Sequence, residues 1–112
     1  MNFIRSAGLI MYYFCEENEN KTYGIRMTNK FYSYTEKFYR GDSYYNMMFR
    51  LFGLLPKDFF HYISSEYNAK FEEHPSLKNY IRTVFTSKED AEKLCRELNR
   101  RFQICVKRGD FS

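Results

Sequence analysis

The sequence predicts an α+β fold: a small single domain with a three- to five-stranded, mainly antiparallel sheet and about three helices packed on one face. Residues 21–28 and 78–85 alternate apolar and polar side chains, which is typical of strands. Residues 86–102 repeat apolar side chains every three or four positions, which is typical of a helix. Since the 112 residues contain no repeat or linker-like stretch, residues 1–112 are predicted to be one domain.

The N-terminal part is predicted to form an antiparallel hairpin. The apolar run at residues 7–15 is about half the length that a bilayer requires, so residues 8–15 are interpreted as a buried strand. Residues 16–20 are polar and predict a turn into the alternating strand 21–28. Residues 29–40 are aromatic without a clear period, and they are predicted to form an irregular connection that includes at most a third short strand.

Two helices are predicted in the middle of the chain. Asp42 or Ser43 can cap the first helix, whose apolar face consists of Met48, Leu51, Phe52 and Leu55. Pro56 separates the helices, because the residue before a proline is pushed out of the α region. The second helix contains Pro56 in its first turn and continues in steps of four through Phe59, Ile63 and Tyr67.

The C-terminal third is predicted to be a strand–helix–strand unit. Residues 69–73 predict a short strand and residues 78–85 a longer one. Thr86 and Glu89 form a capping box for the helix, whose inner face consists of Ala91, Leu94, Cys95, Leu98 and Phe102. The last strand is predicted at residues 103–107, around Ile104 and Val106.

The composition indicates a soluble protein of a reducing compartment, and we expect it in the cytoplasm. The three cysteines are far apart and lie in apolar stretches, so they are interpreted as buried thiols. The 12 Phe and 11 Tyr are unusual, and so many Tyr hydroxyls are too many to bury, so several rings are expected at the surface. Tyr is enriched at interfaces, although compositional drift explains its abundance equally well.

No catalytic, metal or cofactor motif is recognisable, so we expect no enzyme and no small-molecule cofactor. His61 and His74 have no Cys, Asp or second His at ligand spacing. The five glycines are isolated, and none opens a capped helix as a phosphate-binding loop does. An enzyme whose site is assembled from scattered residues remains a second alternative.

The clearest candidate site is a basic face near the C-terminus. The net charge of +4 arises entirely in residues 77–112, which carry nine basic and five acidic side chains. At about 100° per residue, the cations of the last helix lie opposite Ala91. Arg82 and Lys78 are expected to extend the face. Its candidate binding residues are Lys93, Arg96, Arg100, Arg101, Lys107 and Arg108.

Two interpretations of this face stay open. Guanidinium groups donate paired hydrogen bonds to phosphate, which favours an anion site. Glu89–Lys93, Glu92–Arg96 and Lys93–Glu97 are i,i+4 pairs that favour an ordinary solvated face instead. The four cations at 100, 101, 107 and 108 are predicted to lack local acidic partners.

A second candidate is the aromatic stretch between residues 31 and 45, which is interleaved with Lys30, Lys37 and Arg40. Rings beside cations can stack bases, or they can form a protein contact. The candidate binding residues here are Tyr32, Tyr34, Tyr44 and Tyr45. The pattern matches no RRM, KH or zinc-knuckle signature.

The modest charge, the aromatic residues and the lack of catalytic groups favour a protein-binding module whose partner is a protein or nucleoprotein complex, with no membrane partner. A single-stranded DNA- or RNA-binding protein that uses the same basic face is the alternative. Size and composition are similar in kind to small phage or mobile-element inhibitors of host defence, anti-CRISPR proteins among them. No motif carries this similarity, and it implies no residue roles.

Overall fold

The structure is a computed structural model that describes residues 12–28, 41–76 and 81–109. Its elements in chain order are β1 (Tyr12–Glu17), a 3-10 turn η1 (Glu19–Lys21), β2 (Tyr23–Thr28), α2 (Gly41–Phe52), α3 (Pro56–Tyr67), β3 (Lys70–Glu73), β4 (Ile81–Val84) and α4 (Lys88–Arg108). The predicted α+β class is confirmed. Within the described residues, no helix is both long enough and apolar enough for a membrane crossing.

The four strands form two antiparallel pairs, where one sheet was predicted. β1 pairs with β2 from Tyr12–Thr28 to Glu17–Tyr23, and β3 pairs with β4 from Lys70–Val84 to Glu73–Ile81. The two sheets meet at one bridge between Tyr23 and Phe85, whose N–H and C=O groups exchange two hydrogen bonds of 2.8 Å. Because β3 and β4 have only four residues each, the pairing does not extend into one continuous sheet.

The predicted strand at residues 103–107 is wrong, because α4 continues to Arg108. Leu98, Phe102 and Cys105 are buried and follow one another at steps of four and three, which extends the inner face of the helix by a full turn. Gly109 ends the helix in the left-handed region with φ 79°. The C-terminal unit is therefore strand–helix, without a closing strand.

The predicted cap of α4 is wrong by one position. Ser87 is the N-cap, and its hydroxyl accepts the N–H of Asp90 at 3.3 Å. The acidic side chains Glu89 and Asp90 then lie in the first turn, where the helix dipole favours negative charge.

The remaining elements agree with the predictions in type, with shifted boundaries. α3 starts at Pro56 as predicted, with Phe59 and Ile63 buried, and the short strand predicted at 69–73 is β3. Glu16 and Glu17, predicted as a turn, belong to β1, and the turn instead has Asn20 and Lys21 at positive φ. The connection 29–40 and the part of the first strand before Tyr12 lie outside the described residues.

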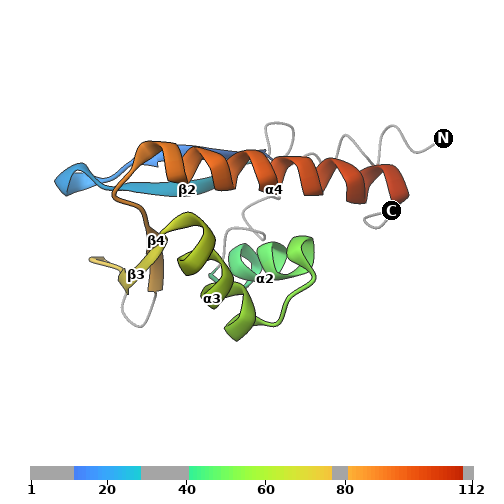
Figure 1. The fold of residues 1–112 in the computed structure, drawn as a ribbon, viewed down its shortest axis with the longest axis horizontal. Coiled ribbons are helices and arrows are strands. Elements are labelled where there is room, and N and C mark those ends of the chain that lie inside the picture. Colours follow the sequence, from blue (N-terminus) through green and yellow to red (C-terminus); the bar gives the residue numbers. More distant parts are fainter. Residues whose placement is uncertain (1–11, 29–40, 77–80, 110–112) are drawn as a thin grey trace.

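The long helix α4 organises the core. In Figure 1 it runs along the β1–β2 hairpin, and α2 and α3 lie below it in the view; α4 contacts all four elements. The side chains at its centre are fully buried; they are Ala91, Leu94, Leu98 and Phe102. They pack with Tyr13 and Met27 from the hairpin and with Phe59 and Ile63 from α3.

One polar side chain fixes α4 against the outer edge of the hairpin. Asn99 accepts the N–H of Tyr13 at 2.8 Å and donates to its C=O at 2.9 Å. In an antiparallel pair, alternate residues direct both backbone groups away from the partner strand. Asn99 therefore occupies backbone groups of β1 that β2 does not use, and it protects an edge that could otherwise pair with another chain.

We expect Asn99→Ala to lower the free energy of unfolding by roughly 1–3 kcal/mol, because both backbone groups of Tyr13 lose this partner in a partly buried place. Urea titration followed by circular dichroism measures the change. Gln103→Ala, on the exposed side of the same helix, is the control and should change stability by less than about 0.5 kcal/mol. Equal effects of the two substitutions would contradict the role of Asn99.

We expect Leu98→Asp to abolish cooperative unfolding, because Leu98 is fully buried and the carboxylate would have no partner there. Ile104→Asp is the matched control on the same helix, since Ile104 is 39% exposed. A folded Leu98→Asp variant with native circular dichroism would show that the inner face of α4 is assigned wrongly.

Candidate functional site

The outer face of α4, defined here as Lys93, Arg96, Arg100, Gln103, Ile104 and Lys107, is the candidate site. Each of these residues is exposed. Lys93, Arg100 and Lys107 are seven residues apart, and seven residues complete two helical turns to within about 20°, so the three lie nearly in line. Because α4 is one continuous helix, Lys107 joins this line over about 21 Å, whereas the prediction placed it on a separate strand.

Glu97 lies beside this face and pairs with two arginines. Arg100 Nε and Nη2 donate to its two carboxylate oxygens at 3.0 and 2.6 Å, and Arg101 Nε donates at 2.6 Å. The hydrogen bond from Arg100 is the main cause that lowers the pKa of Glu97, and Arg101 adds to it. The prediction that Arg100 and Arg101 lack local acidic partners is therefore wrong, since Glu97 lies one turn before them.

Arg100 and Arg101 differ in what else they contact. The Arg101 guanidinium lies over the Phe52 ring, with Cζ 4.2 Å from its centroid, and donates to the Leu51 carbonyl at 3.4 Å. Its side chain therefore attaches α4 to the end of α2. The Arg100 side chain is 59% exposed and has no such second contact among those described. The Arg100 side chain is therefore accessible on the outer face, whereas the Arg101 side chain stabilises the packing of α4 against α2.

The other predicted cations have distinct positions. Arg96 and Lys107 are exposed, and Lys93 Nζ lies 6.0 Å from the centroid of the Tyr67 ring. Arg108 donates to the Cys105 sulfur at 3.7 Å near the end of the helix. Lys93, Arg96, Arg100 and Lys107 thus share one face, and Arg108 lies at its margin.

The predicted tyrosines do not form an exposed cluster in the described residues. Tyr44 is half-buried and donates to the Ile25 carbonyl. Tyr45 is also half-buried and donates to the Ile81 carbonyl at 2.9 Å, beside the Thr83 hydroxyl. Their hydroxyls find backbone partners on strands of both sheets, so the expectation of exposed rings is wrong for these two. Tyr32 and Tyr34 lie outside the described residues.

An aromatic network that the sequence did not indicate connects α2, α3 and β3. Tyr45, Phe49 and Phe60 have ring centroids 5.3–6.3 Å apart, and Phe60 also meets Phe71 at 5.0 Å. Such edge-to-face pairs stabilise a core beyond the area that they bury. The network accounts structurally for part of the aromatic excess.

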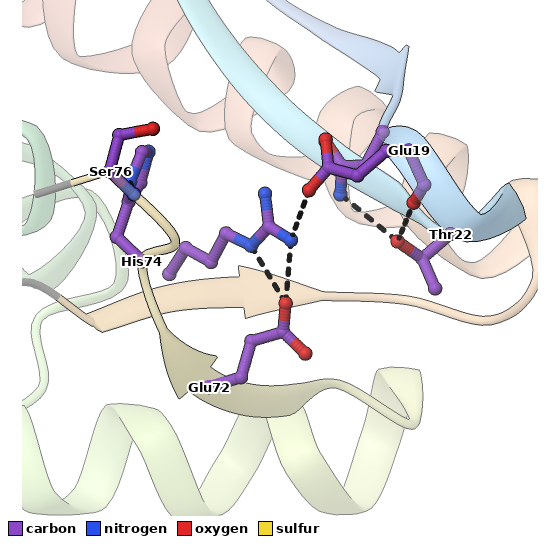
Figure 2. A network of polar contacts seen from close by, with 7 residues as sticks. Glu19, Thr22, Glu72, His74 and Ser76 are labelled. Carbon is purple, nitrogen blue, oxygen red and sulfur yellow. Dashed lines mark hydrogen bonds and ion pairs between the residues drawn. The ribbon is translucent and has the colours of Figure 1, made fainter.

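Arg82, expected to extend the basic face, lies in an ionic cluster between the two sheets. Figure 2 shows Glu72 of β3 and Glu19 of η1 directed toward one guanidinium, that of Arg82. Its Nη2 atom lies 2.6 Å from Glu72 and 2.8 Å from Glu19, and only 18% of its side chain is exposed. Arg82 therefore joins the hairpin turn to the second sheet. Lys78 lies outside the described residues.

The two histidines lie on different parts of the fold. His74 Nδ1 accepts the N–H of Ser76 at 3.0 Å in the turn after β3, as Figure 2 shows, and His61 is exposed on α3. Across residues 12–28, 41–76 and 81–109, no three His, Cys, Asp or Glu side chains are grouped as metal ligands. The outer face of α4 exposes cations and one apolar side chain, Ile104.

We expect Arg82→Gln to lower the midpoint of thermal unfolding by a few degrees, because the two carboxylates lose their shared cation. A hydrogen bond from its own backbone is the main cause that lowers the pKa of Glu19, and Arg82 is the next. A lowered carboxyl pKa contributes stability that is lost as the pH falls through it. The difference between wild type and Arg82→Gln should therefore shrink in acid.

Calorimetry at neutral and acid pH measures this difference. Arg26→Gln is the control, because Arg26 forms an exposed pair with Glu16 that should add little stability. The cluster would not have this role if Arg82→Gln lowered the unfolding midpoint only as much as Arg26→Gln does. A decrease for Arg82→Gln that becomes larger in acid would also contradict it.

Comparison with known proteins finds no relative from which a function could be transferred. No family model matches the sequence, and neither a curated protein nor a solved structure matches the chain.

Proposed function

We propose that the chain is a non-enzymatic binding module that docks on an acidic surface of a partner protein through the outer face of α4. The observation that carries the proposal is the alignment of Lys93, Arg100 and Lys107, with Arg96 beside them, on one helix of 21 residues. The opposite side of this helix is buried, so its outer face has a fixed position on the domain. A fixed row of cations steers and orients an acidic partner.

The composition of the face supports a protein partner. Ile104 is 39% exposed and lies one turn after Arg100, so an apolar side chain interrupts the row of cations. Glu97 and Glu89 border the same face, so its charge is mixed and not uniformly basic. Arginine together with apolar anchors is typical of protein interfaces, whereas a phosphate-binding face is more uniformly basic.

Arg100 can take part although it pairs with Glu97. The pair is largely exposed on the arginine side, and exposed ion pairs contribute little free energy, so exchange for a partner carboxylate costs little. Arg101 is left out of the proposed contact, because it is held against Phe52.

Single-stranded nucleic acid is the second candidate, and the spacing of the cations supports it. Four cations along about 21 Å can contact successive phosphates, and binding would then weaken steeply with salt. An inhibitor of a host nucleoprotein complex is one form that the first proposal takes. That form is supported by size and composition alone.

We expect an amphipathic peptide of glutamate and leucine to bind more tightly than single-stranded RNA of equal charge, because the peptide also contacts Ile104. Fluorescence anisotropy with labelled probes measures both affinities. The double variant Arg96→Glu, Lys107→Glu should weaken peptide binding by roughly tenfold or more. Ile104→Ser should weaken peptide binding and leave RNA binding unchanged, and Glu97→Gln should strengthen binding because it releases Arg100.

Arg26→Glu is the control, because it reverses an equally exposed charge on the hairpin. Tighter binding of RNA than of the peptide, with a steep salt dependence, would support the second candidate instead. Unchanged affinity in the double variant would exclude the outer face of α4 as the contact.

A further inference from the structure

Two of the three thiols lie on neighbouring elements of the core. Cys15 is on β1 and Cys95 is on α4; both are free, and Cys15 packs against the buried cluster that contains Cys95. Cys105 lies ten residues beyond Cys95 on the same helix. The position of Cys15 relative to Cys95 follows from the Asn99–Tyr13 contact.

That contact gives the register between β1 and α4. From Tyr13, Cys15 is two residues along the strand, or about 6.8 Å, and it points to the same side of the strand as the buried Tyr13. From Asn99, Cys95 is four residues back along the helix, or about 6 Å. The two steps are nearly equal in length.

The two steps also have the same direction. In Figure 1 the turn of the hairpin lies at the end where α4 begins, so β1 runs antiparallel to α4. Cys15 is one of the groups that raise the pKa of Cys95. The register therefore places the two cysteines at the same level of the contact between β1 and α4.

We propose that Cys15 and Cys95 form an intramolecular disulfide in the presence of a disulfide oxidant such as oxidised glutathione. Cys15 is half-buried and reacts first, whereas Cys95 is buried. The bond joins residues eighty positions apart and fixes the hairpin to α4.

The reaction consists of two exchanges. The Cys15 thiolate attacks one sulfur of oxidised glutathione, which forms a mixed disulfide and releases one glutathione thiolate. The Cys95 thiolate then attacks the Cys15 sulfur and releases the second glutathione thiolate. In total two cysteine thiols lose their protons and two electrons, and one oxidised glutathione becomes two reduced molecules.

Burial makes this reaction slow at neutral pH. Burial is the main cause that raises the pKa of Cys95 to about 12, and it raises the pKa of Cys15 as well. Since only the thiolate attacks, the rate should increase with pH between 7 and 9. The thiols of Cys15 and Cys95 are therefore expected to stay reduced during a brief exposure to oxidised glutathione and to become oxidised only during a long one.

The native protein is incubated with oxidised glutathione, alkylated, digested and analysed by mass spectrometry. We expect a linked peptide pair that contains Cys15 and Cys95, with a protein mass lower by two hydrogen atoms. The midpoint of thermal unfolding should increase by on the order of 10 °C, because the bond closes a long loop, and dithiothreitol should reverse the increase.

Three variants complete the test. Cys15→Ser and Cys95→Ser should each remove the linked peptide and the increase in the midpoint, whereas Cys105→Ser should retain both. Separate glutathione adducts on Cys15 and Cys95, or a linkage that includes Cys105, would overturn the proposal. The wild-type peptide map decides the question even if a variant fails to fold.

Discussion

The burial of one side of α4 is the constraint on which the rest of the structure depends. The β1–β2 hairpin and the α2–α3 pair both pack against the buried side of this helix, and each is too small to form a core alone. Among the described residues, the two sheets are joined by the Tyr23–Phe85 bridge and by the ionic cluster around Arg82. Contact with the helix therefore holds the parts together, and Asn99 fixes the hairpin in one register along it.

From the sequence, the fold class and most elements could be predicted because the apolar periods are local. The end of α4 could not be predicted, because Ile104 and Val106 are also compatible with a strand. The helix is favoured over the strand because it buries Phe102 and Cys105 on one face, which the sequence alone does not show. The division of the strands into two sheets could not be predicted either, because strand pairing depends on contacts between residues that are far apart in the sequence. The cap at Ser87 was missed because Thr86 offers the same chemistry one residue earlier.

For the candidate site, the sequence predicted which cations lie on the outer side of α4, but it did not indicate what surrounds them. Helical periodicity alone places Lys93, Arg96 and Arg100 outward. It does not show that Arg101 lies against Phe52, since that depends on how α2 packs. For the same reason Tyr44 and Tyr45 appeared to be surface anchors, although their hydroxyls bind carbonyl groups of Ile25 and Ile81.

The long uninterrupted course of α4 has a consequence for recognition. Its backbone is hydrogen-bonded throughout and held along its whole inner side, so it is already ordered before any partner arrives. In the proposed binding mode, the cost in conformational freedom would fall on side chains such as Lys93, Arg96, Arg100 and Lys107, and not on the backbone. Such preorganisation would lower the entropic cost of the proposed binding, and the fixed spacing of the cations would favour partners whose acidic groups have the same spacing.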